Sequence, residues 1–487
     1  MLRRMLLVAC ALGIAAPAAH AADLWQVWQL ATQNDPAFRQ AMANRNASQE
    51  AKPAAWANLF PSIDLNASRT WNNSHGDRLS FFGSQVVPVQ SSSNDRNDQW
   101  GATLTQTLFN WQQFKAIQGA DYTVAQAQAD YETAMQNLIV SVAQAYFNVL
   151  NAQDLLNSDL GNQRALNKQY QQTEQQYKVG LIAVIGVRQA EAAYDQARAQ
   201  VIADRQALAQ AREALRAITG EYLPDLKAPG RDLPLTPPNP ADVKSWVRKA
   251  FADNPTLASA QFAQKIADNQ VSQQQAGYLP NLNLVLQHTR LYGTGHSSYF
   301  VPGQGVTNTP DNSHNYDNQI GLQLQWNIFN GGGTHAAAKQ ARYQADAAMA
   351  AEIAQRRTVE QNVRNAYLAV LSGIAQVQAT KQAVAASEIS LKATAEGLKV
   401  GTQTTLDVLT SRKDLLAAQK TFFTSRYTYL VSVLQLEQAA GTLTPDDVKR
   451  LNNWLQAPGS ATAPAAMSAG APETVPAPIS ATGNGGR

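Results

Sequence analysis

The sequence predicts an α+β membrane protein, in which four β-strands per chain contribute to a barrel shared between copies and long helices form an antiparallel coiled coil. Three observations predict this fold class. The chain is internally duplicated, four segments alternate apolar and polar residues, and two stretches without Pro are far longer than ordinary globular helices. Known membrane barrels need at least about eight strands to close, so four strands per chain can span a membrane only in an oligomer.

The internal duplication is the strongest pattern. Residues 145–150 (AYFNVL) recur as residues 366–371 (AYLAVL), and Lys-Val-Gly at 178–180 recurs at 399–401. Both pairs share one offset, since 366 − 145 and 399 − 178 both equal 221. We therefore predict two structural repeats, each made of a helix, a strand-loop-strand unit, a long helix and a shorter helix.

The repeat pattern sets the expected domain boundaries. The boundaries are residues 22–220 for the first repeat, 221–240 for the linker, 241–441 for the second repeat, 442–457 for the second equatorial segment and 458–487 for the tail. The linker and the segment 442–457 are expected in an equatorial region between strands and helix tips. The tail is rich in Ala, Pro, Gly and Ser and is expected to be disordered.

Residues 1–21 are typical of a secretory signal peptide, with Arg3 and Arg4 before an apolar stretch and a small-residue cleavage site ending at Ala21. The only cysteine, Cys10, lies in this segment, so the mature chain is expected to contain no disulfide and no thiol nucleophile. Lipidation of Cys10 is the alternative to cleavage after Ala21. The apolar stretch before Cys10 is short for that role.

The composition excludes several classes of protein. Only 15% of the residues are charged, against roughly 25% in typical soluble domains. The net charge is +3, and Arg3 and Arg4 supply part of it, so little basic excess remains for binding nucleic acid. A hydrophobic fraction of 45% also argues against a disordered chain.

The strand segments show period-two alternation. In the last of them Ile320, Leu322 and Leu324 alternate with Gly and Gln, and Ile63 and Leu65 do the same in the first. Each run is expected to be about ten residues long, the length of a tilted membrane-crossing strand. Polar loops rich in Gly, Ser and Asn are expected between the strands, at residues 72–98 and 293–318.

The helical segments are expected to form a rod-like wall. Residues 111–178 contain no Pro, and a continuous helix of this length would be roughly 100 Å long. Each long helix is expected to stop at a Val-Gly pair and to be followed by a shorter returning helix, at about 182–219 and 404–440. Apolar residues at heptad spacing predict a seam that holds the helices together: Met135, Leu138, Val142, Ala145 and Val149, then Val359, Val363, Ala366 and Val370.

Catalytic and metal-binding patterns do not stand out. The five histidines after the signal segment, His75, His288, His296, His314 and His335, show no ligand-pair spacing. Gly331-Gly332-Gly333 lacks the residues of a phosphate-binding loop and is better explained as a tight strand-to-helix turn. We therefore expect no enzyme activity, no catalytic residue, no metal and no cofactor.

Four segments together resemble the TolC family of outer-membrane channel-tunnels, over roughly residues 23–456. They are residues 145–153 (AYFNVLNAQ), 177–183 (YKVGLIA), 216–222 (RAITGEY) and 399–409 (KVGTQTTLDVL). The resemblance implies a homotrimer, with a shared twelve-stranded barrel in outer-membrane lipid and a tunnel of helices extending into the periplasm. It also implies passive export of small toxic compounds, proteins or both, from an inner-membrane efflux pump or ABC exporter joined through a periplasmic adaptor (membrane fusion) protein.

The same resemblance implies roles for residues near the helix turns. Adaptor hairpins would contact two tips, Val179-Gly180-Leu181 and Val400-Gly401-Thr402. Asp407 matches one of two family aspartates that narrow the entrance, whereas the other matches Thr410, so one ring of three carboxylates is expected to favour cations. The alternative, without a role in the entrance, is that Asp407 only stabilises the start of its helix through its charge.

The polar links that latch the family's closed entrance match Ile185, Gly186, Leu398 and Gln403. Most of these side chains cannot form such links. Either apolar packing around Ile185 and Leu398 holds the entrance shut, or it opens more easily.

A second class of function fits part of the pattern. This class is a trimeric coiled-coil surface protein with a structural or adhesive role, which is anchored in the membrane by a barrel. Such a protein would also share strands between copies. Its strands would be expected at the C-terminus, whereas here they lie in the middle of each repeat. The export channel is therefore the favoured hypothesis.

Overall fold

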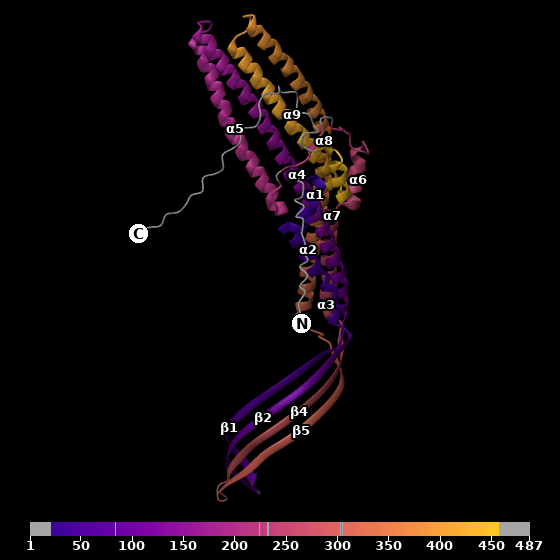
Figure 1. The fold of residues 1–487 in the computed structure, drawn as a ribbon. Coiled ribbons are helices and arrows are strands. Elements are labelled where there is room, and N and C mark those ends of the chain that lie inside the picture. The colour runs from indigo at the N-terminus through magenta and orange to yellow at the C-terminus, as the bar shows by residue number, and fades with distance from the viewer. Residues whose placement is uncertain are drawn as a thin grey trace, which may run out of the picture. The chain divides into compact units, whose positions relative to one another are not determined.

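The computed structural model describes residues 21–456, except residues 83, 224, 231–232, 302 and 304. Cys10, the signal segment before Ala21 and the tail 458–487 lie outside the described residues. The described chain divides into two compact units (Figure 1). Unit one comprises residues 21–39, 136–246 and 363–456, and unit two comprises residues 40–135 and 247–362.

Two very long helices dominate the fold. Helix α4 runs from Trp111 to Lys178 and α8 from Gly333 to Lys399, so the predicted limits of α4 are confirmed. Gly331 and Gly332 have positive φ just before α8, which confirms the predicted strand-to-helix turn. The first part of each helix belongs to unit two and the second part to unit one.

The heptad seam is buried as predicted, because its side chains pack between helices. Leu138, Val142, Ala145 and Val149 of α4 are all buried, as are Val359, Val363 and Val370 of α8. Met135 and Ala366 are only partly buried. The returning helices are α5 (Val184–Thr219) and α9 (Thr405–Ala439), close to their predicted limits.

The segments predicted as single helices are broken at Pro in both repeats. Residues 24–57 form α1 (Leu24–Asn34), α2 (Pro36–Gln49) and α3 (Ala51–Ala57). In the second repeat α6 (Val243–Asp253) and α7 (Pro255–Gln275) follow the same plan, with a short 3-10 turn, η1 (Ala276–Tyr278), after α7. A residue before Pro avoids the helical region, and its side chain then caps the next helix.

The two breaks are alike in detail. Asp35 has ψ 121° and accepts a hydrogen bond from the backbone N–H of Phe38 at 2.6 Å. Asn254 has ψ 116° and accepts one from Leu257 at 3.1 Å. The duplication therefore extends to the capping of these helices.

Unit two contains one antiparallel sheet with strand order β1-β2-β4-β5. The strands are β1 (Ser62–Phe82), β2 (Gln85–Phe109), β4 (Asn281–Val301) and β5 (Gly305–Gln325), with 21, 25, 21 and 21 residues. The prediction of ten-residue strands with long loops at 72–98 and 293–318 was therefore wrong. The strands continue through both polar segments: β1 ends at Phe82 and β2 begins at Gln85, and β4 ends at Val301 and β5 begins at Gly305.

Cross-strand contacts explain why these polar segments are strands. The hydroxyls of Ser74 and Ser93 lie 2.8 Å apart, and Ser298 donates a hydrogen bond to Asn308 at 2.7 Å. Asn, Ser and Gly have low intrinsic preference for strands, but pairing with a neighbouring strand outweighs that preference.

The sheet has one apolar face and one polar face. By strand alternation and register, Ile63, Leu65, Ile320, Leu322 and Leu324 share one face. They remain exposed, Leu65 to 79% and Ile320 to 77%. The other face carries polar residues such as Asn66, Gln99 and Gln319. A wide apolar face of this kind needs a covering of lipid or protein.

The two connecting segments meet within unit one. Strand β3 (Ala228–Pro229) pairs with β6 (Leu455–Gln456), and α10 (Pro445–Asn452) contacts α1. The buried Arg426 of α9 donates a hydrogen bond to the carbonyl of Gly230 at 2.6 Å, which ties this small sheet to the helices. The limits of the predicted domains remain a proposal.

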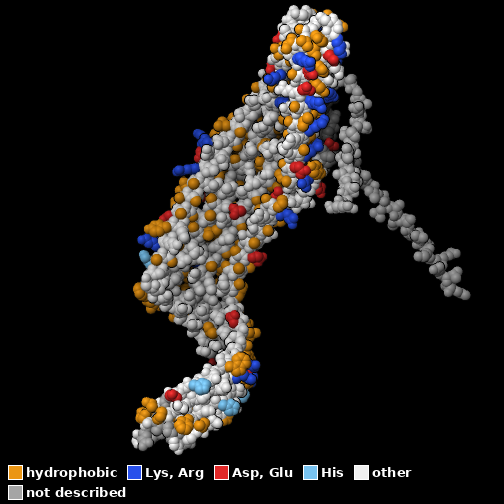
Figure 2. All heavy atoms as spheres, turned by 90° about the vertical axis from the view of Figure 1, so that its left-hand side faces the viewer, with side chains coloured by type: hydrophobic (Ala, Val, Ile, Leu, Met, Phe, Trp, Pro, Cys, Tyr) orange, Lys and Arg blue, Asp and Glu red, His pale blue; other side chains and the backbone are white. Residues whose placement is uncertain are grey.

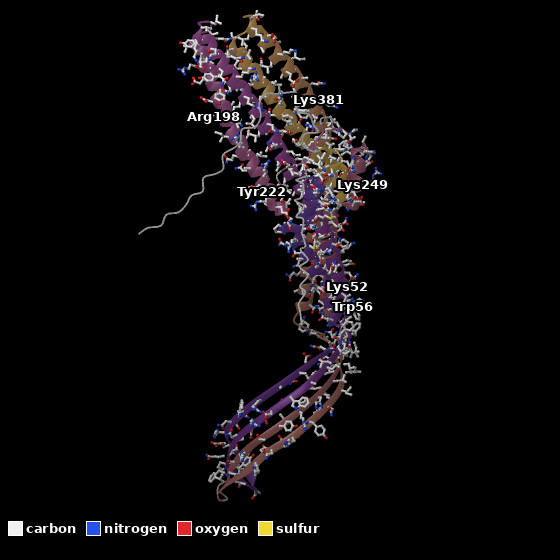
Figure 3. All side chains as sticks on the ribbon, in the orientation of Figure 1. Lys52, Trp56, Arg198, Tyr222, Lys249 and Lys381 are labelled. Carbon is white, nitrogen blue, oxygen red and sulfur yellow. The ribbon has the colours of Figure 1, made fainter. Side chains whose placement is uncertain are left out.

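Lys52 and Trp56, which Figure 3 labels, lie on α3 of unit two. Lys52, one turn before Trp56 on α3, forms an ion pair with Asp121 of α4 at 2.8 Å. Across the described residues, no helix is both long enough and apolar enough to cross a membrane.

Candidate functional site

The turns that end α4 and α8 lie at the same end of unit one (Figure 1). At the first, Leu181 donates to the carbonyl of Gln176 at 2.9 Å and Gly180 donates to Tyr177 at 2.9 Å. This pair of bonds defines a Schellman motif, in which the residue of positive φ is Gly180 at 77°.

The second turn repeats the motif. Thr402 donates to Gly397 at 2.9 Å, Gly401 donates to Leu398 at 3.3 Å, and Gly401 has φ 79°. The sequence prediction that both glycines stop helices is therefore confirmed. The glycine is needed because other residues rarely adopt this conformation.

The two tips expose apolar side chains. Val179, Leu181 and Val400 are 70%, 74% and 75% exposed. Gly180 and Gly401 are surrounded by open space, so nothing within unit one covers the turns at these glycines. Apolar side chains held out by a rigid turn provide a surface for contact with another protein.

Asp407 lies in the first turn of α9 and forms a capping box with Thr404. Its carboxylate accepts hydrogen bonds from the Thr404 backbone at 2.8 Å and from the Thr404 hydroxyl at 2.7 Å. The Thr404 hydroxyl in turn accepts one from the Asp407 backbone at 3.2 Å. The backbone hydrogen bond from Thr404 lowers the pKa of Asp407, so the carboxylate is ionised at neutral pH.

This cap exists in one repeat only. The offset of 221 places Ala183 and Gly186 where the second repeat has Thr404 and Asp407. Helix α5 accordingly starts without a side-chain cap at Ala183. The capping function of Asp407 is thus an observed role, and its predicted role in a cation ring stays a prediction.

The residues matched to the family's latch lie around these turns. Ile185 and Gln403 are exposed, and Leu398 and Gly186 are partly buried. A Cβ at Gly186 would lie 3.6 Å from Ile182, an ordinary contact. Thr410 is exposed on the next turn of α9. The single chain leaves Ile185 exposed, and the predicted apolar packing around it stays a prediction.

Sequence analysis missed a polar seam between α4 and α9. Tyr427 donates to Asp154 at 2.6 Å, and Ser158 donates to Gln419 at 3.3 Å. The Nζ of Lys420 lies 2.5 Å from Asp159. These contacts join the long helix of the first repeat to the returning helix of the second.

The seam includes a buried pair of carboxyls. Asp159 of α4 is 1% exposed, and the neighbouring Asp204 of α5 is also buried and accepts a hydrogen bond from Gln200 at 2.9 Å. Burial first, and then the carboxyl of Asp204, raise the pKa of Asp159 to about 6, although Lys420 opposes this shift. Only the fold brings these three charged residues together, because their spacing matches no local motif.

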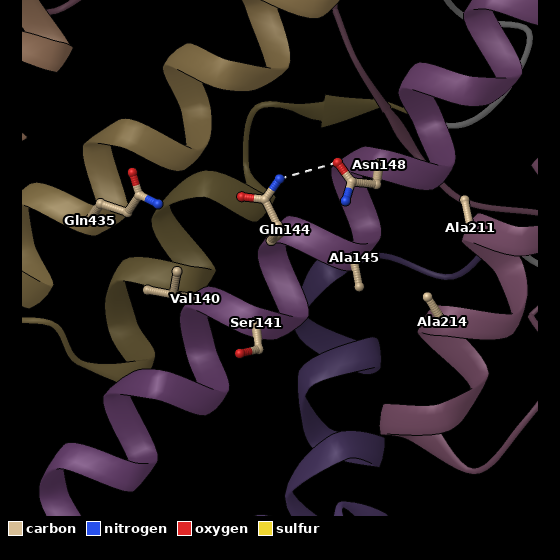
Figure 4. Close-up of a pocket in the computed structure, with 8 residues that line it drawn as sticks. All are labelled: Val140, Ser141, Gln144, Ala145, Asn148, Ala211, Ala214 and Gln435. Atoms are coloured by element: carbon tan, nitrogen blue, oxygen red, sulfur yellow. Dashed lines mark hydrogen bonds between the residues drawn. The ribbon is translucent and has the colours of Figure 1, made fainter. Parts of the chain in front are cut away.

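A hollow of about 470 Å³ lies between α4, α5 and α9 (Figure 4). Its lining contains amides and small side chains, including Gln144, Asn148 and Gln435, and Gln144 donates to Asn148 at 3.1 Å. No lining residue is titratable. Within the part of the chain that the structure describes, no three His, Cys, Asp or Glu residues are grouped as metal ligands.

Comparison with known families decides the identity of the fold. The family described as outer membrane efflux protein matches residues 27–221 and 246–442. The chain belongs to the outer membrane efflux protein family. The two matched segments correspond to the two halves of the internal duplication in this efflux-family chain, as the sequence predicted.

Curated relatives agree with this assignment. The efflux-family chain is 33% identical to Outer membrane protein TolC of Escherichia coli over 91% of this chain and 86% of the relative. It is 27% identical to Alkaline protease secretion protein AprF of Pseudomonas aeruginosa, over 88% and 87% of the two chains. The names of these relatives describe an outer membrane protein and a secretion protein.

Solved structures show the same fold. The Campylobacter jejuni CmeC outer membrane channel matches with a TM-score of 0.69 at 18% identity, over 88% of this chain and 89% of that chain. VceC of Vibrio cholerae matches with a TM-score of 0.68 at 20% identity, over 86% and 96%. The efflux-family chain is an outer-membrane export channel that extends into the periplasm.

Proposed function

We propose that three copies of this chain form one continuous passive duct, with a twelve-stranded barrel and a tunnel of helices. The observation that carries the proposal is the sheet of unit two. Its strand order leaves β1 and β5 at the edges, and its apolar face is exposed. Edge strands in a bilayer must pair, so each β5 would join the β1 of the next copy. The family resemblance supplies the number three.

The duct has no energy source of its own, so a pump must drive export. An inner-membrane efflux pump or ABC exporter and a periplasmic adaptor fit this need. The relative AprF is named for secretion of a protease, and CmeC is an outer membrane channel. Because the family is described by efflux and the relative TtgC is named for a toluene efflux pump, small toxic compounds are one proposed class of cargo, and unfolded proteins are the other. The chain itself would carry out no chemistry.

The adaptor would bind the two tips. Val179 and Leu181 at one tip and Val400 at the other are exposed apolar side chains on rigid Schellman turns, which supports contact with apolar side chains of adaptor hairpins. Gly180, Gly401 and Thr402 would set the shape of the turns.

The entrance would be narrowed by Asp407. Its ionised carboxylate, repeated in three copies around an axis, would attract cations and repel anions. Thr410 would leave the second ring uncharged. Ile185, Leu398, Gly186 and Gln403 would surround this ring, with apolar packing between copies in place of polar links.

Single-channel conductance of the purified oligomer in planar bilayers tests this function. We expect a small, cation-selective conductance that a trivalent cation blocks from the periplasmic side. A large unblocked conductance would keep the duct and remove Asp407 as the gate. If a folded oligomer gave no conductance, the duct would be wrong and the barrel-anchored surface protein would become the leading hypothesis.

A further inference from the structure

Positive charge gathers on the apolar face of the sheet. Strands β1, β2, β4 and β5 contain four arginines and no lysine. Strand alternation and register place three of them, Arg69, Arg96 and Arg290, on the apolar face. The apolar face therefore carries most of the permanent positive charge of these strands.

The three arginines occupy adjacent positions. Arg290 pairs in register with Trp100, and two residues further along the strands Arg69 pairs with Asp98. A further two residues along, Arg96 pairs with Trp71. All three thus lie within three consecutive rows of one face. We call Arg69, Arg96 and Arg290 the arginine patch.

Ring contacts hold the arginine patch against aromatic side chains. The guanidinium of Arg290 lies 4.9 Å from the ring centre of Tyr292, and that of Arg69 lies 6.0 Å from Trp71. Such contacts keep the long arginine side chain extended and its N–H groups accessible. The patch is therefore ordered without being covered.

One acidic side chain offsets part of the charge. Asp98 lies 2.5 Å from Arg69 and 3.1 Å from Arg96, and these two arginine side chains stay 52% and 46% exposed. Three arginines and one aspartate leave a net charge of +2 per chain on the patch. Arg290 is outside the ion pairs with Asp98.

The arginine patch lies next to the apolar rows. One row before Arg290 is Leu65, which pairs with Ala102, and the row before that contains Leu104, Leu286 and Ile320. Figure 2 shows hydrophobic side chains together with histidines on the sheet surface in view. In a membrane the apolar rows face hydrocarbon, so the next rows face headgroups.

From this position we infer that the arginine patch binds the phosphate groups of outer-membrane lipid headgroups. The inference rests on the proposed function, because it requires the sheet to be inserted as a barrel. A guanidinium presents two parallel N–H groups that match phosphate oxygens, and a charge beside hydrocarbon is less screened than one in water. Aromatic side chains in the same rows suit the interface, because one end of each is apolar and the other polar.

A phosphorylated outer-membrane glycolipid, with and without phosphatase treatment, tests the inference. Titrated into the purified oligomer in detergent, the phosphorylated form is expected to raise the temperature of oligomer dissociation. The Arg290→Gln variant should need about fivefold more glycolipid for the same effect, and the Arg69→Gln/Arg96→Gln/Arg290→Gln variant more still. Arg198→Gln is the control, because it removes the same charge from an exposed position of α5, outside the sheet.

Several results would overturn the inference. Equal weakening by Arg198→Gln and Arg290→Gln, or equal binding of the dephosphorylated glycolipid, would do so. An equal effect of inorganic phosphate would show that the patch binds free anions and not a headgroup. Conductance of each variant separates the proposed duct from the proposed lipid binding. If the variants conduct and bind the glycolipid as the wild type does, only the lipid-binding role of the arginine patch is overturned. If the wild-type oligomer did not conduct, both the barrel and the lipid-binding role of the arginine patch would be overturned.

Discussion

Lys420 of α9 and Asp159 of α4 form an ion pair with 2.5 Å between Nζ and Oδ2, and the Asp159 side chain is almost completely buried. The pair connects helices from the two repeats, and Asp204 of α5 adds a second carboxyl to the same place. A separation of α9 from α4 would leave these charges without partners in the interior. The junction therefore resists movement of the second repeat against the first.

Replacing the lysine tests the energetic value of this junction. Lys420→Met should lower the free energy of unfolding by about 3 kcal/mol, because the buried carboxyl of Asp159, which has Asp204 beside it, loses its counter-ion. Chemical denaturation followed by circular dichroism measures the change. The control is Lys399→Met, whose ion pair with Glu396 is largely exposed and should change stability by less than about 0.5 kcal/mol. Equal effects of the two variants would contradict a special role for Lys420.

The raised pKa of Asp159 predicts the direction of a pH effect. In the folded chain Asp159 keeps its proton up to pH of about 6, whereas its ordinary value in an unfolded chain is 3.8. The folded state therefore binds more protons between these values, and this contribution to stability is lost as the pH rises through about 6. Asp204→Asn removes one cause of the shift.

The measurement is the difference in melting temperature between Asp204→Asn and the wild type. The melting temperature of the variant should rise relative to that of the wild type as the pH rises from 4 to 7. The change is expected between 3.8, the ordinary pKa of Asp159, and about 6, its pKa in the folded chain. Asp195→Asn, on an exposed position of α5, is the control and should show no such trend. A constant difference for Asp204→Asn would show that the two carboxyls are not coupled.

The capping box allows the charge of Asp407 to be tested apart from its hydrogen bonds. Asp407→Asn keeps an acceptor oxygen for Thr404 and removes the negative charge. We expect weaker trivalent-cation block and lower cation selectivity, measured as single-channel conductance and reversal potential. Because the backbone hydrogen bond from Thr404 lowers the pKa of Asp407 below its ordinary value of 3.8, block in the wild type should persist from neutral pH down to that value.

A second capping box supplies the control for this experiment. At the start of α10, away from the helix turns, Thr444 donates to the Asp447 carboxylate from its backbone at 2.8 Å and from its hydroxyl at 2.9 Å, and Asp447 also pairs with Arg450. Asp447→Asn should lose a similar small amount of stability and leave block unchanged. If both variants altered block equally, the effect would reflect helix capping and not a ring of charge.

The two turn glycines predict a backbone effect. Gly180→Ala and Gly401→Ala should each cost about 1 kcal/mol, because φ of 77° and 79° is strained for a residue with a side chain. The matched control is Gly186→Ala, where a Cβ makes only an ordinary contact with Ile182. Thermal melting measures stability, and faster amide hydrogen exchange at the turns would locate the change. An effect of Gly186→Ala as large as the other two would contradict this explanation.

Much of the fold could be predicted because it is encoded locally. The limits of α4 follow from a Pro-free heptad pattern that ends in Val179-Gly180, and the same features repeat 221 residues later. The helix turns of the candidate site follow from the same two glycines. Local patterns cannot predict the polar halves of the strands, because Asn, Ser and Gly become strand residues only when a neighbouring strand satisfies their backbone.

The sequence by itself determined the duplication, because its two copies can be compared residue by residue. It also determined the long helices, the glycine turns and the apolar face of the strands, since each of these depends on residues close together in the chain. Only the tertiary structure decided that the strands extend through residues 72–98, because their backbone is satisfied by a neighbouring strand. It alone also brought Asp159, Asp204 and Lys420 together. Those three residues lie on different helices, and burial, which sets their energetics, is a property of the packed chain and not of any segment.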